Sequence, residues 1–104
     1  MLDIPNFCRE TRENHALSLL LCNDPNLIDF LLTSNREHLT GPSEELVQVS
    51  KAFSRGQQVL IQVALDIWSG EGGASINDVL WGLDNIRFEN FMLAMEFLRY
   101  GQKS

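Results

Sequence analysis

A chain of 104 residues is long enough for one domain of ordinary size, and 44% hydrophobic residues is typical of a globular fold rather than a disordered one. The 14 acidic and 8 basic residues give a formal net charge of −6, and the basic residues are scattered singly, without the basic stripe that nucleic-acid binding usually requires. No apolar run approaches the ~20 residues of a membrane span, and the N-terminus lacks the pattern of a signal peptide. We therefore expect a single cytoplasmic domain over residues 1–104.

The N-terminal third is predicted to contain two helices and a loop. The first helix is expected over residues 6–21 from the spacing of its apolar residues. Asp24 followed by Pro25 predicts the start of a second helix, over residues 25–33, with the Asp24 carboxylate as its cap. The polar residues 34–41 are predicted to form a loop.

The apolar spacing of residues 43–69 predicts helix throughout, either as one bent helix or as two. Ser54 and Gln57 have the spacing of a capping box, in which Ser54 accepts from the Gln57 amide and the Gln57 side chain reaches back. If helix restarts there, the apolar residues of 55–69 cover roughly 240° of its circumference. A helix with so wide an apolar arc needs packing partners on two sides.

Capping signals define two more helices in the C-terminal third. Ser75 followed three residues later by an acid predicts the start of a short helix that ends near Gly82. Asp84 predicts the cap of a last helix over residues 85–100, and Gly101 marks its end. This last helix is also apolar over roughly 240°.

The two widest apolar helices determine the expected architecture, an all-α compact array of about six helices. Residues 55–69 and 85–100 should lie against each other as a central pair, with nearly fully buried side chains between them. These core residues would be Leu60, Val63, Ile67, Phe91, Met95 and Leu98. The second apolar side of the last helix must then meet either the N-terminal helices or a second copy of the chain, and both alternatives are open.

The only glycine cluster, residues 70–75, runs into a helix N-terminus, where backbone amides can bind phosphate. It lacks the lysine and the preceding strand of a Walker-type loop. We therefore interpret it as a flexible junction, in which alanine at Gly72 and Gly73 would change the stability only modestly.

Histidine and cysteine residues give little indication of chemistry. Cys8, His15 and Cys22 recur every seven residues, about 10.5 Å apart along a helix, which is too far for one zinc ion. We expect two buried thiols and a half-buried His15 on one helix face, and a solvated His38. No catalytic motif is present, so no catalytic residue, metal or cofactor is predicted.

The short helix that ends near Gly82 and the last helix have the lengths and the short turn of a helix-turn-helix. The second helix would present Asn85, Arg87 and Asn90 near its start, but also Glu89 and a long apolar surface. This pattern is the basis of an alternative function, a DNA-binding or DNA-mimicking regulator.

Six of the nine aromatic residues lie between residues 68 and 100. Large aromatic side chains anchor many protein interfaces. The candidate interface residues are Trp81, Phe88, Phe91, Met92, Met95 and Tyr100. The expected function is a non-enzymatic protein–protein interaction or regulatory module, homodimeric, with an acidic surface for an unidentified protein partner.

Overall fold

The structure is a computed structural model that describes the backbone of residues 4–101 and the side chains of residues 12–101. Six α-helices and no strand are present in this part of the chain, which confirms the predicted all-α fold. The helices are α1 (Ile4–Leu20), α2 (Pro25–Leu31), α3 (Ser43–Ser50), α4 (Arg55–Ser69), α5 (Ile76–Gly82) and α6 (Asn85–Tyr100). Between residues 4 and 101, no helix is both long enough and apolar enough to cross a membrane.

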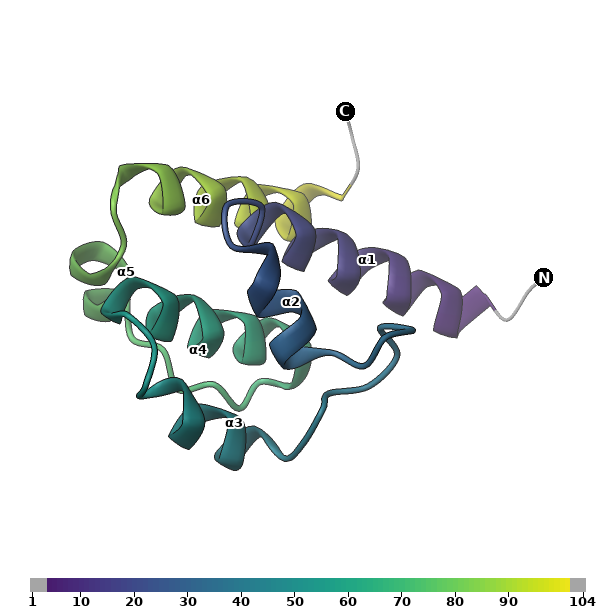
Figure 1. Cartoon of the computed structure of the whole chain (residues 1–104). Helices are drawn as coiled ribbons and strands as arrows, with labels where there is room; N and C mark the ends of the chain where they lie inside the picture. The colour runs from purple at the N-terminus through teal and green to yellow at the C-terminus, as the bar shows by residue number, and fades with distance from the viewer. Residues whose placement is uncertain (1–3, 102–104) are drawn as a thin grey trace.

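Helix α4 is the centre of the fold, because it contacts α1, α2, α3 and α5. Figure 1 shows α1 and α6 side by side in one layer, α4 below them, α3 on the far side of α4, and α5 at the end where α4 and α6 begin. The interior is built mainly from leucine, isoleucine and valine. Its fully buried large side chains include Leu20, Leu21, Leu27, Leu31, Leu60, Ile61 and Leu65.

The prediction of a central pair is only partly correct. Helix α6 makes its most extensive contact with α1, not with α4. Leu60 and Val63 are buried as predicted. The other four predicted core residues are only half-buried: Ile67, Phe91, Met95 and Leu98. The physical reason is that α1 packs on both helices with Ala16, Leu17 and Leu20 buried, so α4 and α6 do not close on each other.

Local capping explains why several helix boundaries agree with the prediction. Residues 43–69 form two helices, since residues 51–54 interrupt them and Ser54 caps α4 by accepting from the Gln57 amide at 3.2 Å. The predicted capping box is only half formed, because the Gln57 side chain donates to Asp24 instead. Ser75 and Asp78 form a complete box at the start of α5.

The predicted loop after α2 is closed by its own hydrogen bonds. The Thr33 amide donates to the His38 carbonyl at 2.9 Å, and the Thr40 hydroxyl donates to the Phe30 carbonyl at 2.7 Å. The Asn14 side chain donates to the Arg36 carbonyl at 3.2 Å. This last bond joins the loop to α1.

Glycine allows α5 to lie directly on α4. A Cβ atom at Gly82 would be 2.8 Å from Cγ2 of Val59, closer than side chains tolerate. The end of α5 is therefore fixed against the first turns of α4. The short turn at Leu83 and Asp84 then starts α6, and Asp84 caps it by accepting from the Arg87 amide at 3.0 Å.

Candidate interaction surface

An apolar groove with a volume of about 560 Å³ lies between α4, α5 and α6. This volume is within the usual range of ligand-binding clefts, ~300–1,000 Å³. The apolar lining residues are Val63, Ile67, Ala74, Ile76, Val79, Leu80, Phe88, Phe91, Met95 and Leu98. Five of the six residues predicted for a closed core therefore line this open groove; Val63 is buried at its base, and the other four are half-buried. We call this feature the α4–α6 groove.

The two polar side chains that line the α4–α6 groove are already engaged. The Asp66 carboxylate accepts from the amides of Gly72 and Gly73 at 2.8 and 3.1 Å, and from the amide of Ala74 at 3.1 Å. The Ser75 hydroxyl accepts from the Asp78 amide at 3.0 Å. The groove therefore offers apolar contact and few directional hydrogen bonds.

The same bonds correct the interpretation of residues 70–75 as a flexible junction. Gly70 does end α4 with a φ of 78°, as a C-terminal glycine should. Gly72, however, is buried, and a Cβ atom there would be only 1.8 Å from the Gln62 carbonyl oxygen. The backbone of this loop is packed on α4, and the amides that were considered for phosphate binding hold the carboxylate of Asp66.

Large hydrophobic side chains are exposed mainly on α5 and α6. Among the described residues, seven of the eight that are strongly exposed belong to these two helices: Ile76, Leu80, Trp81, Ile86, Met92, Leu93 and Tyr100. The eighth is Val49 on α3, 52% exposed. Trp81 is the most exposed, at 81%.

Three of these residues form a line along α6. Ile86, Leu93 and Tyr100 are seven residues apart and so share one face of the helix. We call them the outer stripe. Phe97 on the adjoining part of α6 contacts the exposed His15 of α1, with ring centroids 4.5 Å apart. Helix α1 thus covers part of the second apolar side of α6, and the outer stripe stays exposed.

The six candidate interface residues divide into two groups. Phe88, Phe91 and Met95 line the α4–α6 groove, and the rings of the two phenylalanines stack with centroids 5.9 Å apart. The other three are exposed and lie outside the groove lining: Trp81, Met92 and Tyr100. The structure does not place all six on one continuous face.

A buried ion pair fixes the start of α6, and no local pattern in the sequence indicates it. Arg87 donates to both carboxylate oxygens of Asp24, from Nε at 2.6 Å and from Nη2 at 2.7 Å, and to Asp84 from Nη1 at 2.9 Å. Asp24 is 3% exposed. The hydrogen bonds from Arg87 lower the pKa of Asp24, against a smaller effect of burial that raises it.

This ion pair corrects the predicted role of Asp24. Asp24 occupies the position before α2, but its side chain makes no capping hydrogen bond. A two-pronged, charge-assisted contact with a guanidinium is stronger than a bond to one backbone amide, so the carboxylate turns to Arg87. Asn90 donates to Asn23 at 2.8 Å and adds a second link between α6 and the turn after α1.

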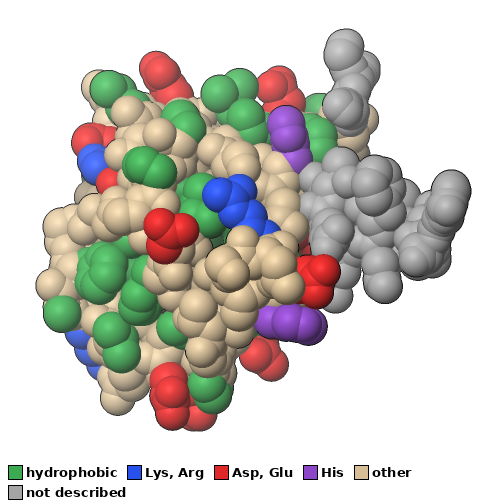
Figure 2. Space-filling view, turned by 45° about the vertical axis from the view of Figure 1, so that its right-hand side comes forward, with side chains coloured by type: hydrophobic (Ala, Val, Ile, Leu, Met, Phe, Trp, Pro, Cys, Tyr) green, Lys and Arg blue, Asp and Glu red, His purple; other side chains and the backbone are tan. Residues whose placement is uncertain are grey.

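The residues of the helix-turn-helix interpretation are largely engaged within the chain. Arg87 is held by Asp24 and Asp84, and Asn90 is buried against Asn23. On the face shown in Figure 2, acidic and basic side chains are interspersed, and no block of Lys or Arg is visible. Neither observation favours contact with a phosphate backbone.

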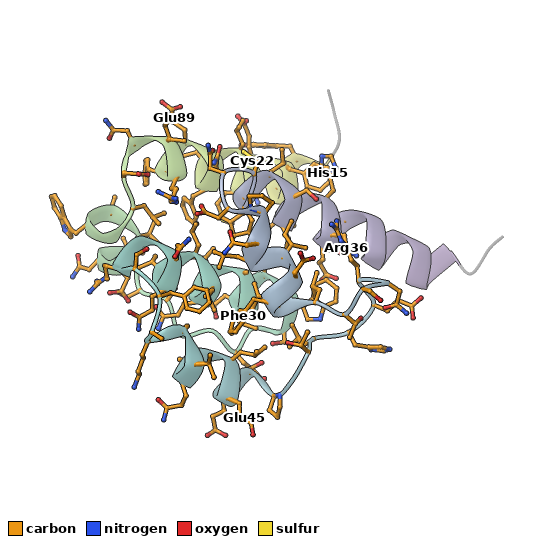
Figure 3. The ribbon with its side chains drawn as sticks, viewed as in Figure 1. His15, Cys22, Phe30, Arg36, Glu45 and Glu89 are labelled. Carbon is orange, nitrogen blue, oxygen red and sulfur yellow. The ribbon has the colours of Figure 1, made fainter. Side chains whose placement is uncertain are left out.

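Cysteine and histidine do not gather into a site. The side chain of Cys22 is exposed in the turn after α1, not buried as predicted, because α1 ends at Leu20. Figure 3 shows Cys22 and His15 at separate positions along α1 and its following turn. His15 is exposed rather than half-buried, His38 is exposed as predicted, and Cys8 lies outside the described side chains. Over residues 12–101, no group of His, Cys, Asp and Glu could hold a metal ion.

Comparison with known proteins identifies no relative: no protein-family model, no curated protein and no solved structure matches this chain.

Proposed function

We propose that the protein is a non-enzymatic protein–protein interaction module of the cytoplasm, and that it forms a two-fold dimer through the outer stripe of α6. The observation that carries this proposal is the concentration of exposed large hydrophobic side chains on α5 and α6, with Val49 as the one exception among the described residues. Contiguous apolar surface is costly in water, and in natural proteins it marks a contact site. The exposed thiol of Cys22 is compatible with a reducing compartment.

The geometry of the outer stripe suits a helix pair. Its side chains recur every seven residues, which is the repeat of paired helices. A second α6 that runs antiparallel across a two-fold axis would place Leu93 near the axis, with Ile86 of each copy facing Tyr100 of the other. Such pairing would cover Ile86, Leu93 and Tyr100, which are 56%, 49% and 68% exposed.

Charge makes this dimer sensitive to salt in a definite direction. Each chain carries a formal charge of −6, and Glu89 and Glu96 flank the outer stripe along α6. Figure 3 shows Glu89 pointing away from the body of the protein. Since salt screens repulsion between exposed like charges, moderate salt should strengthen the dimer, whereas an interface built on opposite charges would weaken.

Paired substitutions test this proposal. Ile86→Asp with Leu93→Asp places charge on the outer stripe, and Val49→Asp is the matched control, because Val49 is similarly exposed but lies on α3. In sedimentation velocity at micromolar concentration, we expect a dimer for the wild type and for the control, and a monomer for the double variant. Circular dichroism checks that all three are folded. A dimer that survives the double variant, or that the control disrupts equally, would exclude the outer stripe as the interface.

A further inference from the structure

We propose that the α4–α6 groove binds an amphipathic helix of a partner protein, whose apolar face enters the groove and whose flanks carry Lys and Arg. This inference rests on the proposed function, because it names the partner chemistry of the same interaction module. It concerns a different surface from the outer stripe, so that the two can be tested separately.

The lining of the groove argues for the apolar face of the occupant. Phe88, Phe91 and Met95 are half-buried, and Ile76 and Leu80 on the opposite wall are 77% and 49% exposed. A site for a small polar molecule needs a few free polar groups that converge on it. Here the polar groups are Asp66 and Ser75, and both are used by backbone amides of the chain itself. What remains is a surface for aliphatic and aromatic side chains.

The length of the groove argues for a helix. Along α6 the lining extends from Phe88 to Leu98, a rise of ten residue steps, which at 1.5 Å per step is about 15 Å. A docked amphipathic helix contacts its groove with residues i, i+3 or i+4, and i+7. These positions span about 10.5 Å, or two turns, so two turns of a docked helix fit within the groove and fill it with several side chains.

The charges beside the groove argue for basic flanks. Asp66 lines the groove, and Glu71 is exposed in the loop whose last residues also line it. Glu89 and Glu96 flank the outer stripe on the other side of α6 and do not border the groove. Arg55 pairs with Asp78 of α5 at 3.0 Å, and Arg87 pairs with Asp24 and Asp84; the third arginine of α4, α5 and α6 is the exposed Arg99. The surroundings are thus acidic on balance. A second copy of this chain would bring the same charge of −6, so Lys and Arg on a different protein complement the groove better.

The experiment uses two synthetic fourteen-residue helical peptides with the same leucine face, one with lysine and one with glutamate on its flanks. Binding of each labelled peptide to the full chain is measured by fluorescence anisotropy. We expect the lysine peptide to bind at least tenfold more tightly than the glutamate peptide, and its Kd to rise with salt. Equal binding of the two peptides would overturn the role of charge. If neither peptide binds, the groove is not a site for a helix.

Variants locate the binding site. Ile76→Gln with Leu80→Gln removes two exposed apolar residues of the groove wall, and Val49→Gln removes one of similar exposure outside the groove. The double variant should weaken lysine-peptide binding tenfold or more, and the control less than twofold. If the Ile76→Gln, Leu80→Gln variant loses the dimer that the wild type forms, the groove binds a second copy of the chain. If the wild type binds neutral phospholipid vesicles and the same variant does not, the groove binds lipid. Either result overturns the inference. If the wild type is a dimer through the outer stripe but binds no peptide, only this inference fails, and the proposed function remains.

Discussion

The ion pair between Asp24 and Arg87 provides a sharp test of how the fold is held together. The perturbation is Arg87→Met, which keeps a long side chain at the start of α6 but removes its charge and its hydrogen bonds. Asp24 would then be a buried carboxylate with only the Gln57 side chain as its partner, at 3.2 Å. Its charge cannot easily be retained there, because burial penalises an unpaired anion.

The magnitude follows from the exposure of the two partners. Breaking a buried ion pair by removal of one partner costs about 3–5 kcal/mol. The Arg87 side chain is 27% exposed, against 3% for Asp24, so water reaches one end of the site and we expect the lower end, about 3 kcal/mol. Replacing both partners with apolar residues, Asp24→Leu with Arg87→Met, should cost less than the single change, because no orphaned charge is left.

The assay is urea denaturation at neutral pH, followed by circular dichroism, with equal m values as the condition for comparison. Arg55→Met is the matched control, since Arg55 pairs with Asp78 at 3.0 Å but its side chain is 64% exposed, and exposed pairs contribute below about 1 kcal/mol. A loss below about 1 kcal/mol for Arg87→Met, or a double variant that is less stable than the single one, would refute the reasoning.

Three further predictions concern the same framework. In the folded protein the pKa of Asp24 lies below its ordinary value of 3.8. The ion pair therefore contributes its full stability well above pH 3.8, and this contribution is lost as the pH falls towards the lower folded-state pKa. The difference in stability between wild type and Asp24→Asn, measured by urea denaturation, should stay constant above about pH 5 and shrink below about pH 3.8. In thermal melts, Gly72→Ala should destabilise the protein by about 2 kcal/mol or more, because the added Cβ would strike the Gln62 carbonyl. Gly73→Ala should cost about 1 kcal/mol, because Gly73 has a φ of 76°. Equal and negligible losses would mean that the loop is not packed on α4. Leu60→Ala should cost about 2–5 kcal/mol and Leu98→Ala less than half as much in urea denaturation, since Leu60 is fully buried and Leu98 lines the groove; a reversed order would place the core elsewhere.

The helices could be predicted from the sequence because their limits depend on nearby residues. Ser54, Asp84 and Gly101 act on backbone groups within a few positions, so α4 and α6 begin and end where those residues indicate. The wide apolar arc of α4 was also correctly interpreted as a need for packing on more than one side, since α4 contacts α1, α2, α3 and α5. The same expectation for α6 is met only by its contact with α1, because its other apolar residues line the groove or stay exposed. That interpretation could not tell which surfaces would meet, since periodicity describes a face and not its partner.

The features that were missed depend on residues far apart in the sequence. Asp24 and Arg87 are 63 positions apart, and each has a local explanation, a helix cap and a scattered base, that hides their pairing. Gly72 looked like a flexible linker residue, but its close approach to the Gln62 carbonyl exists only when the loop folds back on α4. The residues of the α4–α6 groove were likewise predicted to form a closed core, because the same apolar side chains can line an open groove or fill a buried core.

The self-association of the wild-type chain is the most direct test of the proposed function. Sedimentation equilibrium at micromolar concentration, in about 20 mM and about 300 mM salt, measures both the mass and the effect of charge screening. We expect a monomer–dimer equilibrium that reaches twice 11.8 kDa, with the dimer favoured at the higher salt. A single species of 11.8 kDa under both conditions would contradict the dimer through the outer stripe.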